Sequence, residues 1–272
     1  MKAYSTDRLD KEFWESRPLI GMVHLRPLPG SPTDAGEGMG SVLTRAIEDA
    51  IALEQGGASA IMVENFFDAP FERDNLPAHT IAALTLAVSA VRSAVKLPIG
   101  VNALRNDAKA AIGIAHVCDA SFVRINVYVG AAVTDQGLIQ GASREAILLR
   151  KQLGANVAIM ADVFVKHAAQ LGGGVIEDAA KDAVERGMAD ALIVSGAATG
   201  ASTDIEDVRR VREAVPNAPV LIGSGMTAES AQGLLKWATG AIVGTSLKIG
   251  GVAANPVDVD RVRALREAMD RA

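Results

Sequence analysis

Several short apolar runs in this sequence end in side chains that can transfer protons or hold a polar substrate. Carboxylates and histidines are the usual general acids and bases. A lysine can hold an anion or, when desolvated, form a Schiff base with a carbonyl. The catalytic candidates are His24, Glu64, Asp162 and Lys166, and the substrate-binding candidates are Asn65, Asn102, Arg124, Asn126 and His167.

Two of these candidates have competing interpretations. For Lys166 the alternative is a solvated loop lysine. Arg124 and Asn126 lie two apart, so they face the same side of a strand. We expect Arg124 to point into the fold, where a lone charge is costly and needs Glu64 or Asp162 as its partner. A purely structural ion pair is the alternative role for Arg124.

His24 stands just before three prolines, Pro27, Pro29 and Pro32. Proline fixes φ and cannot donate to a strand ladder, so the strand must end there and continue as a stiff, extended loop. We therefore interpret His24 as a positioned polar group in the site. The alternative is a satisfied histidine at the rim.

Small residues end the last three apolar runs. Glycines let a backbone approach an anion closely, and a helix beginning at Thr227 would add the favourable field of its N-terminus. The alternative is that these residues only make tight turns. We predict a phosphate site built from Ser195, Gly196, Thr199, Gly200, Gly223, Ser224, Gly225, Gly244, Thr245 and Ser246.

The sequence gives no signature of a bound metal or cofactor. His24, Glu64, Asp162 and His167 have ligand chemistry, but their spacing follows no metal-binding pattern. No GxGxxG motif opens the first unit of strand and helix. We expect neither a metal nor a cofactor.

These residues must be positioned by eight apolar runs that alternate with eight Ala-rich stretches of helical spacing. Continuous apolar runs are typical of parallel strands buried on both faces. Eight repeats predict a (β/α)8 TIM barrel, with a doubly wound open sheet as the alternative. The runs are 18–25, 58–65, 97–104, 121–129, 156–165, 189–196, 218–225 and 240–246, and the predicted helices are 41–55, 78–95, 106–117, 143–153, 175–187, 204–214, 227–238 and 258–270.

Local signals refine this organisation. Ser143, Asp204 and Thr227 are predicted helix N-caps. We expect one barrel domain over 18–272, with residues 1–17 as an N-terminal extension that includes a short helix over the barrel bottom. The loop 128–143 is long enough for a lid. The three phenylalanines of the loop 66–79 are expected to pack on the rim, with a pocket wall as the alternative.

Composition narrows the class of protein. The chain has 272 residues, 49% of them hydrophobic, and a net charge of −5 without a basic patch, which argues against nucleic acid as a partner. The single cysteine, Cys118, fits a reducing compartment. No apolar leader is present at the N-terminus, and the longest apolar stretch, 81–91, is too short to span a membrane. We expect a cytoplasmic protein with a small phosphorylated ligand, and leave a homo-oligomer open.

Nine motifs resemble the BtpA/SgcQ family in order along residues 18 to 251. They include "GMVHLRPLPGSP", "VENFFDAPF", "GVNALRNDAKAA", "FVRINVYVGA", "ADVFVKHA" and "VLIGSGMTAES". A minor departure is Arg26, where family members often have proline. The resemblance implies a TIM barrel and phosphate loops similar to those of ribulose-phosphate-binding barrels. One branch of that family is associated with photosystem I biogenesis, and the other with sugar-phosphate genes and a nucleosidase label.

We therefore favour an enzyme acting on a small phosphorylated sugar or a ribosyl or nucleoside-type compound. Isomerisation, aldol cleavage and N-glycosidic cleavage all fit carboxylates and a cation around a pocket. The alternative is a non-catalytic biogenesis or assembly factor, of the photosystem I or membrane-complex type. Polar residues at five strand ends favour the enzyme, because a structural barrel gains little from placing costly charges there.

Overall fold

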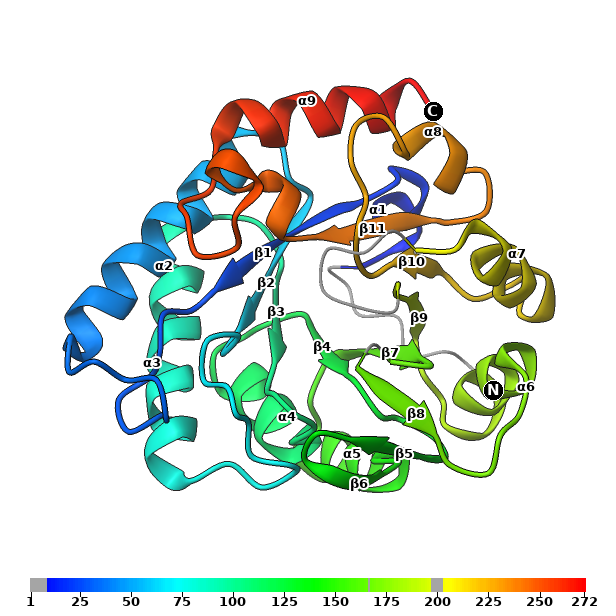
Figure 1. Cartoon of the computed structure of the whole chain (residues 1–272), viewed down its shortest axis with the longest axis horizontal. Helices are drawn as coiled ribbons and strands as arrows, with labels where there is room; N and C mark the ends of the chain where they lie inside the picture. Colours follow the sequence, from blue (N-terminus) through cyan, green and yellow to red (C-terminus); the bar gives the residue numbers. More distant parts are fainter. Residues whose placement is uncertain (1–8, 166, 197–202) are drawn as a thin grey trace.

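Eight parallel strands close into a barrel in the computed structural model, which describes residues 9–165, 167–196 and 203–272 (Figure 1). The TIM barrel is therefore confirmed, and the open doubly wound sheet is wrong. β1 pairs with β2 on one side and with β11 on the other, which closes the sheet. The strands are β1 (Leu19–His24), β2 (Ala60–Glu64), β3 (Ile99–Asn102), β4 (Phe122–Ile125), β7 (Ala158–Val163), β9 (Ala191–Val194), β10 (Val220–Ile222) and β11 (Gly240–Val243).

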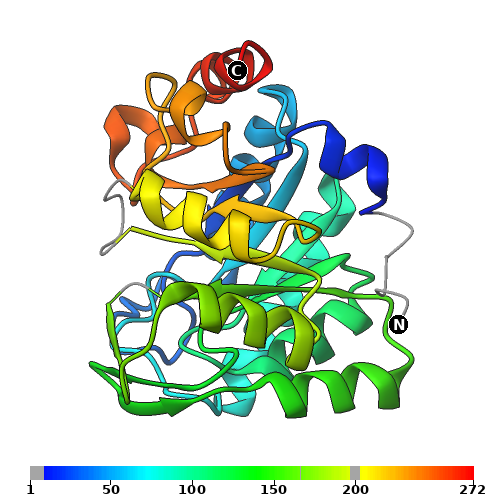
Figure 2. The same cartoon turned by 90° about the vertical axis from the view of Figure 1, so that its right-hand side faces the viewer.

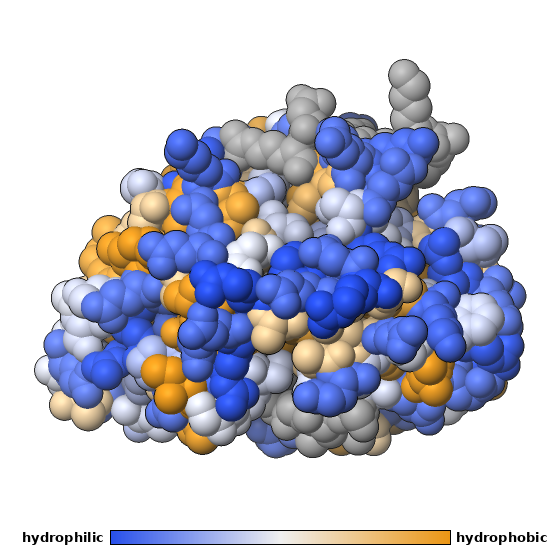
Figure 3. All heavy atoms as spheres, turned by 90° about the horizontal axis from the view of Figure 1, so that it is seen from above, coloured by the Kyte–Doolittle hydropathy of each residue, from blue (hydrophilic) through white to orange (hydrophobic). Residues whose placement is uncertain are grey.

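Helices follow the strands and cover the outside of the barrel (Figures 1 and 2). Their apolar sides pack on the outward-facing strand residues in one large core. Figure 3 shows the face that carries α9 as mostly hydrophilic, as expected for the outer sides of such helices. None of the described helices is both long and apolar enough to cross a membrane. The helices are α2 (Gly38–Gln55), α3 (Ala78–Ala94), α4 (Ala108–Val117), α5 (Ser143–Leu153), α6 (Ile176–Lys181), α7 (Ile205–Ala214), α8 (Ala231–Leu234) and α9 (Val259–Asp270).

Helix ends differ from the sequence expectations at one of the three predicted caps. The side chain of Asp204 caps α7 by accepting from the backbone N–H of Glu206, as predicted. Ser143 is instead the first residue of α5, which follows Ala142 without a side-chain cap. The hydroxyl of Thr227 accepts from the backbone N–H of Ser230, and the Thr227 carbonyl accepts from the N–H of Ala231, so Thr227 caps the turn that leads into α8. The predicted cap at Thr227 is therefore present, but the regular helix is only four residues long and offers little field to an anion.

The barrel interior is layered, because alternate residues of each strand point inward. The lower layers are apolar and include Ile20 and Met22 of β1, Met62 of β2 and Phe122 of β4. The next inward position on each strand is polar or glycine. These upper positions, which ring the mouth of the barrel, are His24, Glu64, Asn102, Arg124, Asp162, Ser195, Gly223 and Gly244.

The bottom of the barrel is covered by α1 (Lys11–Glu15). Asp10 caps this short helix by accepting from the backbone N–H of Phe13. Leu9, Phe13 and Trp14 pack against the apolar interior cluster. In Figure 2, α1 (dark blue) lies at the opposite end of the barrel from the hairpin of β5 (Ala131–Thr134) and β6 (Gly137–Gln140).

That hairpin lies within the loop 128–143, which the sequence suggested as a lid. β5 and β6 pair antiparallel, and β8 (Ala168–Gln170) from the loop after β7 adds a third strand. Ala132 and Ile139 are buried with Val127 and Val165, while Val133 and Leu138 face outward. A small apolar face thus turns the loop into a sheet, which fixes it over one side of the mouth.

Gly100 offers a test of the barrel packing. A Cβ at this position would overlap the ring of Phe122, which fills the space that the glycine leaves on the neighbouring strand. We expect Gly100→Ala to lower the free energy of unfolding by about 1–3 kcal/mol through overpacking. Gly113→Ala in α4 is the matched control, because no atom lies within 4 Å of the added methyl. It should stabilise the protein by about 0.5–1 kcal/mol in urea denaturation. Equal changes in the free energy of unfolding for the two variants would contradict this packing of Phe122 against Gly100.

Candidate functional site

A buried arginine and aspartate anchor the mouth of the barrel. Nε and one terminal nitrogen of Arg124 donate to the two carboxylate oxygens of Asp162 at 2.9 and 2.8 Å. Both side chains are almost fully excluded from solvent. Burial on its own would lower the pKa of Arg124, but the charge and hydrogen bonds of Asp162 outweigh it and raise that pKa. Asp162 is therefore the partner that the sequence required for Arg124.

Further donors occupy the same carboxylate. Asn126 donates to Asp162 Oδ2 at 2.7 Å, and Ser195 donates to Oδ1 at 3.3 Å. Asn102 in turn donates to Asn126 Oδ1 at 3.0 Å. With each oxygen of Asp162 accepting two hydrogen bonds, the geometry favours a positioning role for this residue over the acid–base role considered from the sequence.

Glu64 and His24 form the polar pair on the opposite side of the mouth. They lie at paired positions on neighbouring strands, with His24 Nε2 4.0 Å from Glu64 Oε1. The imidazole stacks on the ring of Phe66 at a centroid distance of 4.3 Å. A Cβ on Gly244 would come within 2.8 Å of the imidazole, so this glycine leaves room for His24. The stacking and the close backbone fix the orientation of the histidine.

The first of two cavities at the mouth has a volume of about 280 Å³ and is formed largely by small residues. Ser224 accepts from the backbone N–H of Gly196, and Ser246 donates to the carbonyl of Met226, which ties the loops together. Arg261 reaches this cavity from α9 and donates to the carbonyl of Ser246 at 3.3 Å. Of the predicted residues, this cavity is lined by His24, Glu64, Arg124, Gly223, Ser224, Gly225, Gly244, Thr245 and Ser246.

The second cavity, of about 350 Å³, adjoins the first and shares Glu64 and Arg124 with it. Its remaining walls come from the loops after β2, β3 and β7 and from Asp135 in the hairpin. Phe66 and Phe71 line it, so they form a pocket wall rather than only packing on the rim. The predicted residues along it are Glu64, Arg124, Asn126 and His167.

Other predicted residues lie behind these walls or outside the described part of the chain. Five predicted residues line neither cavity: Asn65, Asn102, Asp162, Ser195 and Gly196. Asn65, Asn102 and Gly196, for example, make hydrogen bonds to residues that line one of the cavities. Lys166, Thr199 and Gly200 lie outside the described residues. Among residues 9–165, 167–196 and 203–272, no three His, Cys, Asp or Glu side chains gather closely enough to hold a metal ion.

Sequence reasoning missed two cations at the mouth. Arg105 follows β3 by three residues and lines the second cavity. Arg261 comes from a helix far along the chain from the loops that it joins. The polar run soon after β3, Arg105-Asn106-Asp107, was a signal for the first. No local pattern distinguishes Arg261 from the other arginines of α9.

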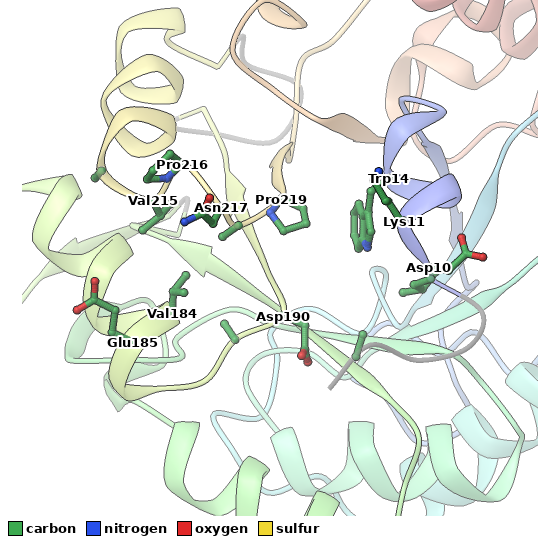
Figure 4. A pocket seen from close by; sticks show the side chains of 15 residues that line it. Asp10, Lys11, Trp14, Val184, Glu185, Asp190, Val215, Pro216, Asn217 and Pro219 are labelled. Atoms are coloured by element: carbon green, nitrogen blue, oxygen red, sulfur yellow. The ribbon is translucent and has the colours of Figure 1, made fainter. Parts of the chain in front are cut away.

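A larger cavity of about 560 Å³ lies at the other end of the barrel. Figure 4 shows it between Trp14 of α1 and Pro216 and Pro219 from the loop before β10. The half-buried acid in this cavity, Asp190, is held by an ion pair with Arg150 and by the backbone N–H of Ile159. The polar cluster at the mouth, and not cavity size, therefore identifies the candidate site, as in other barrels of this class.

Residues 15–271 match the sequence profile of the BtpA family. An uncharacterized protein of Thermococcus kodakarensis is 46% identical over 93% of this chain and 95% of its own length. Photosystem I biogenesis protein BtpA of Synechocystis sp. is 43% identical over 96% of this chain and 91% of its own. The sgc region protein SgcQ of Escherichia coli K12 is 35% identical over 92% and 93%.

Solved structures share the fold at low sequence identity. Thiamine phosphate pyrophosphorylase from Pyrococcus furiosus is 15% identical with a TM-score of 0.60, covering 95% of this chain and 98% of that one. Phosphoribosyl anthranilate isomerase from Thermus thermophilus is 13% identical with a TM-score of 0.57, covering 93% and 98%. At this identity the likeness shows the barrel fold alone.

Proposed function

The chain belongs to the BtpA family, and on that premise we propose that it is an enzyme acting on a small phosphorylated, sugar-type substrate. The observation that carries the proposal is that Glu64 and Arg124 line both cavities at the mouth. A substrate that fills both cavities passes directly over a buried carboxylate and a fixed cation. Names of solved neighbours, such as thiamine phosphate pyrophosphorylase and phosphoribosyl anthranilate isomerase, describe enzymes of phosphorylated compounds and support the class.

The first cavity is proposed to hold the phosphate. Its loops combine glycines with the hydroxyls of Ser224, Thr245 and Ser246, which suit an anion approached by backbone and side-chain donors. Arg261 adds a guanidinium that can make charge-assisted hydrogen bonds to phosphate oxygens. Thr199 and Gly200, which also belong to the proposed phosphate loops, lie outside the described residues.

Glu64 and His24 are proposed as the acid–base pair. Isomerisation of a sugar phosphate fits them best, because it needs a base for a C–H proton and an acid for the neighbouring oxygen, without a second substrate. Glu64 takes the carbon-bound proton, and His24 gives a proton to the carbonyl oxygen. Arg124, oriented by Asp162, stabilises the negative charge that develops between them. Aldol cleavage through a Schiff base on Lys166 is the alternative reaction. Borohydride trapping in the presence of substrate would detect its covalent intermediate.

The name of the Synechocystis relative raises the alternative of a non-catalytic assembly factor. That role does not require a carboxylate shared by two cavities. Replacing the chromosomal gene by one that encodes the Glu64→Gln variant distinguishes an enzyme from an assembly factor. If the protein is an enzyme, the variant should lose the biological role. If the protein is an assembly factor, the variant keeps its surface and should retain that role.

Arg261→Gln tests the phosphate cavity. With glucitol 6-phosphate as the probe, we expect binding to weaken by about tenfold or more, since one charge-assisted hydrogen bond is lost. Arg263→Gln on the same helix is the matched control, because Arg263 pairs with Asp260 at the surface and lines neither cavity. Titration calorimetry gives both affinities. Unchanged binding in Arg261→Gln, or equal losses in both variants, would contradict a phosphate held beside α9.

A further inference from the structure

Arg105 is a buried cation that the proposed reaction does not use. Only 5% of the residue is exposed, and it lines the second cavity with Phe66 and Phe71. A guanidinium is rarely placed in such surroundings without a role, because removing it from water is costly. The cavity lies on the far side of Glu64 and Arg124 from the proposed phosphate loops.

The backbone on both sides of Arg105 is held by buried amides. Asn65 accepts from the N–H of Leu104 at 2.8 Å and donates to its carbonyl at 3.4 Å. Asn106 makes the same pair of bonds with Val127, at 2.7 and 3.0 Å. The N–H of Arg105 itself donates to the carbonyl of Glu72 at 2.9 Å. Two asparagine side chains therefore fix the place from which this guanidinium enters the cavity.

The electrostatic settings of the two buried arginines differ. Arg124 has its charge matched by Asp162, which raises its pKa despite burial. For Arg105 burial is the largest influence and lowers the pKa, and the carboxylates of Asp162, Glu64 and Asp135 offset only part of it. An anionic ligand in the second cavity would favour the charged form of Arg105 further.

The shape and chemistry of the cavity point to the kind of anion. Arginine presents a planar fork that matches a carboxylate. Among the described residues, the lining of the second cavity has no run of glycines and hydroxyls like that of the first, and it is mainly aromatic, apolar or charged. Asp135 at its edge disfavours a dianion more than a single negative charge.

We propose that Arg105 binds a carboxylate at the end of the substrate remote from the phosphate, so that the substrate is a phosphorylated sugar acid or a related phosphorylated carboxylic acid. This rests on the proposed function, because the first cavity must hold the phosphate for the second to receive the other end. The reacting carbons then lie between the two anionic groups, over Glu64.

Matched probes test the carboxylate directly. The pairs 3-phosphoglycerate and glycerol 3-phosphate, 4-phosphoerythronate and erythritol 4-phosphate, and 6-phosphogluconate and glucitol 6-phosphate differ only in a carboxylate replacing a hydroxymethyl group. We expect the acid to bind at least about tenfold more tightly in the pair whose length fits, since a charged hydrogen-bonded contact is gained. Calorimetry is performed on the wild type, Arg105→Gln and Arg105→Lys. Arg73→Gln is the control, because this exposed arginine of the same region pairs with Asp74.

In Arg105→Gln the preference for the acid should vanish while the affinity for the alcohol stays the same, which also shows that the variant folds. Arg105→Lys, which keeps the charge and loses the fork, should retain part of the preference. Arg261→Gln should weaken acid and alcohol by the same factor. If the alcohols bind but no acid gains affinity, the carboxylate site is wrong and the phosphate site stands. If no phosphorylated probe binds, both proposals fail.

Discussion

Replacing Glu64 with glutamine is expected to lower kcat/KM for the phosphorylated substrate by about 10²- to 10⁴-fold, the usual loss when a general acid–base group is removed. The amide keeps the shape of the side chain but cannot take the proton. Binding of glucitol 6-phosphate should change by less than about threefold, because Glu64 is not proposed to contact the phosphate. Glu37→Gln is the control, since this exposed glutamate pairs with Arg26 outside the two cavities.

Two results would contradict this role for Glu64. One is turnover by Glu64→Gln within about tenfold of the wild type, which would place the proton transfer elsewhere. The other is a parallel loss of probe binding and thermal stability, which would make Glu64 structural. His24→Gln provides a second reading, because loss of the proposed acid should lower kcat more than it changes probe affinity.

The second large effect concerns stability. Asp162→Asn should lower the free energy of unfolding by about 3–5 kcal/mol, because Arg124 would remain charged and buried without a counter-charge. Asp260→Asn breaks an exposed pair with Arg263 and should cost less than about 1 kcal/mol. Urea denaturation monitored by circular dichroism measures both.

The double variant Arg124→Met with Asp162→Leu separates stability from function. Apolar replacement of a buried ion pair is often close to neutral, so this variant should regain most of the stability lost in Asp162→Asn. It should not regain turnover, because Arg124 also lines both cavities. Full activity in the double variant would show that the pair has only a structural role.

The strands and the ring of polar residues were predictable from the sequence. The strands follow from the repeated apolar runs, and the ring follows from the polar residues at the ends of those runs. Alternation along a strand carries Met22 and His24 to the same side, and the barrel then brings every strand end to one mouth. The pairing of Arg124 with Asp162 also followed, since a buried charge needs a counter-charge, although sequence alone left Glu64 as an equal candidate.

What could not be predicted depends on contacts between distant segments. The sequence indicates an acid–base role for Asp162, but its oxygens accept hydrogen bonds from Asn126, Ser195 and Arg124. The cap at Thr227 is present, but the helix that it leads into is only four residues long instead of extending to residue 238. The hairpin over residues 131–140 depends on a third strand from the loop after β7. The alternation of buried and exposed residues along the hairpin was the available signal for these two strands.

The most direct test of an enzyme at the barrel mouth is a turnover screen. The wild-type and Glu64→Gln proteins are incubated in parallel with a mixture of phosphorylated sugars and sugar acids, and products are followed by mass spectrometry and phosphorus NMR. The account predicts that the wild type consumes one phosphorylated compound and that inorganic phosphate inhibits this consumption. The Glu64→Gln protein should leave the same compound unconsumed. Consumption by neither protein, or equal consumption by both, would contradict it.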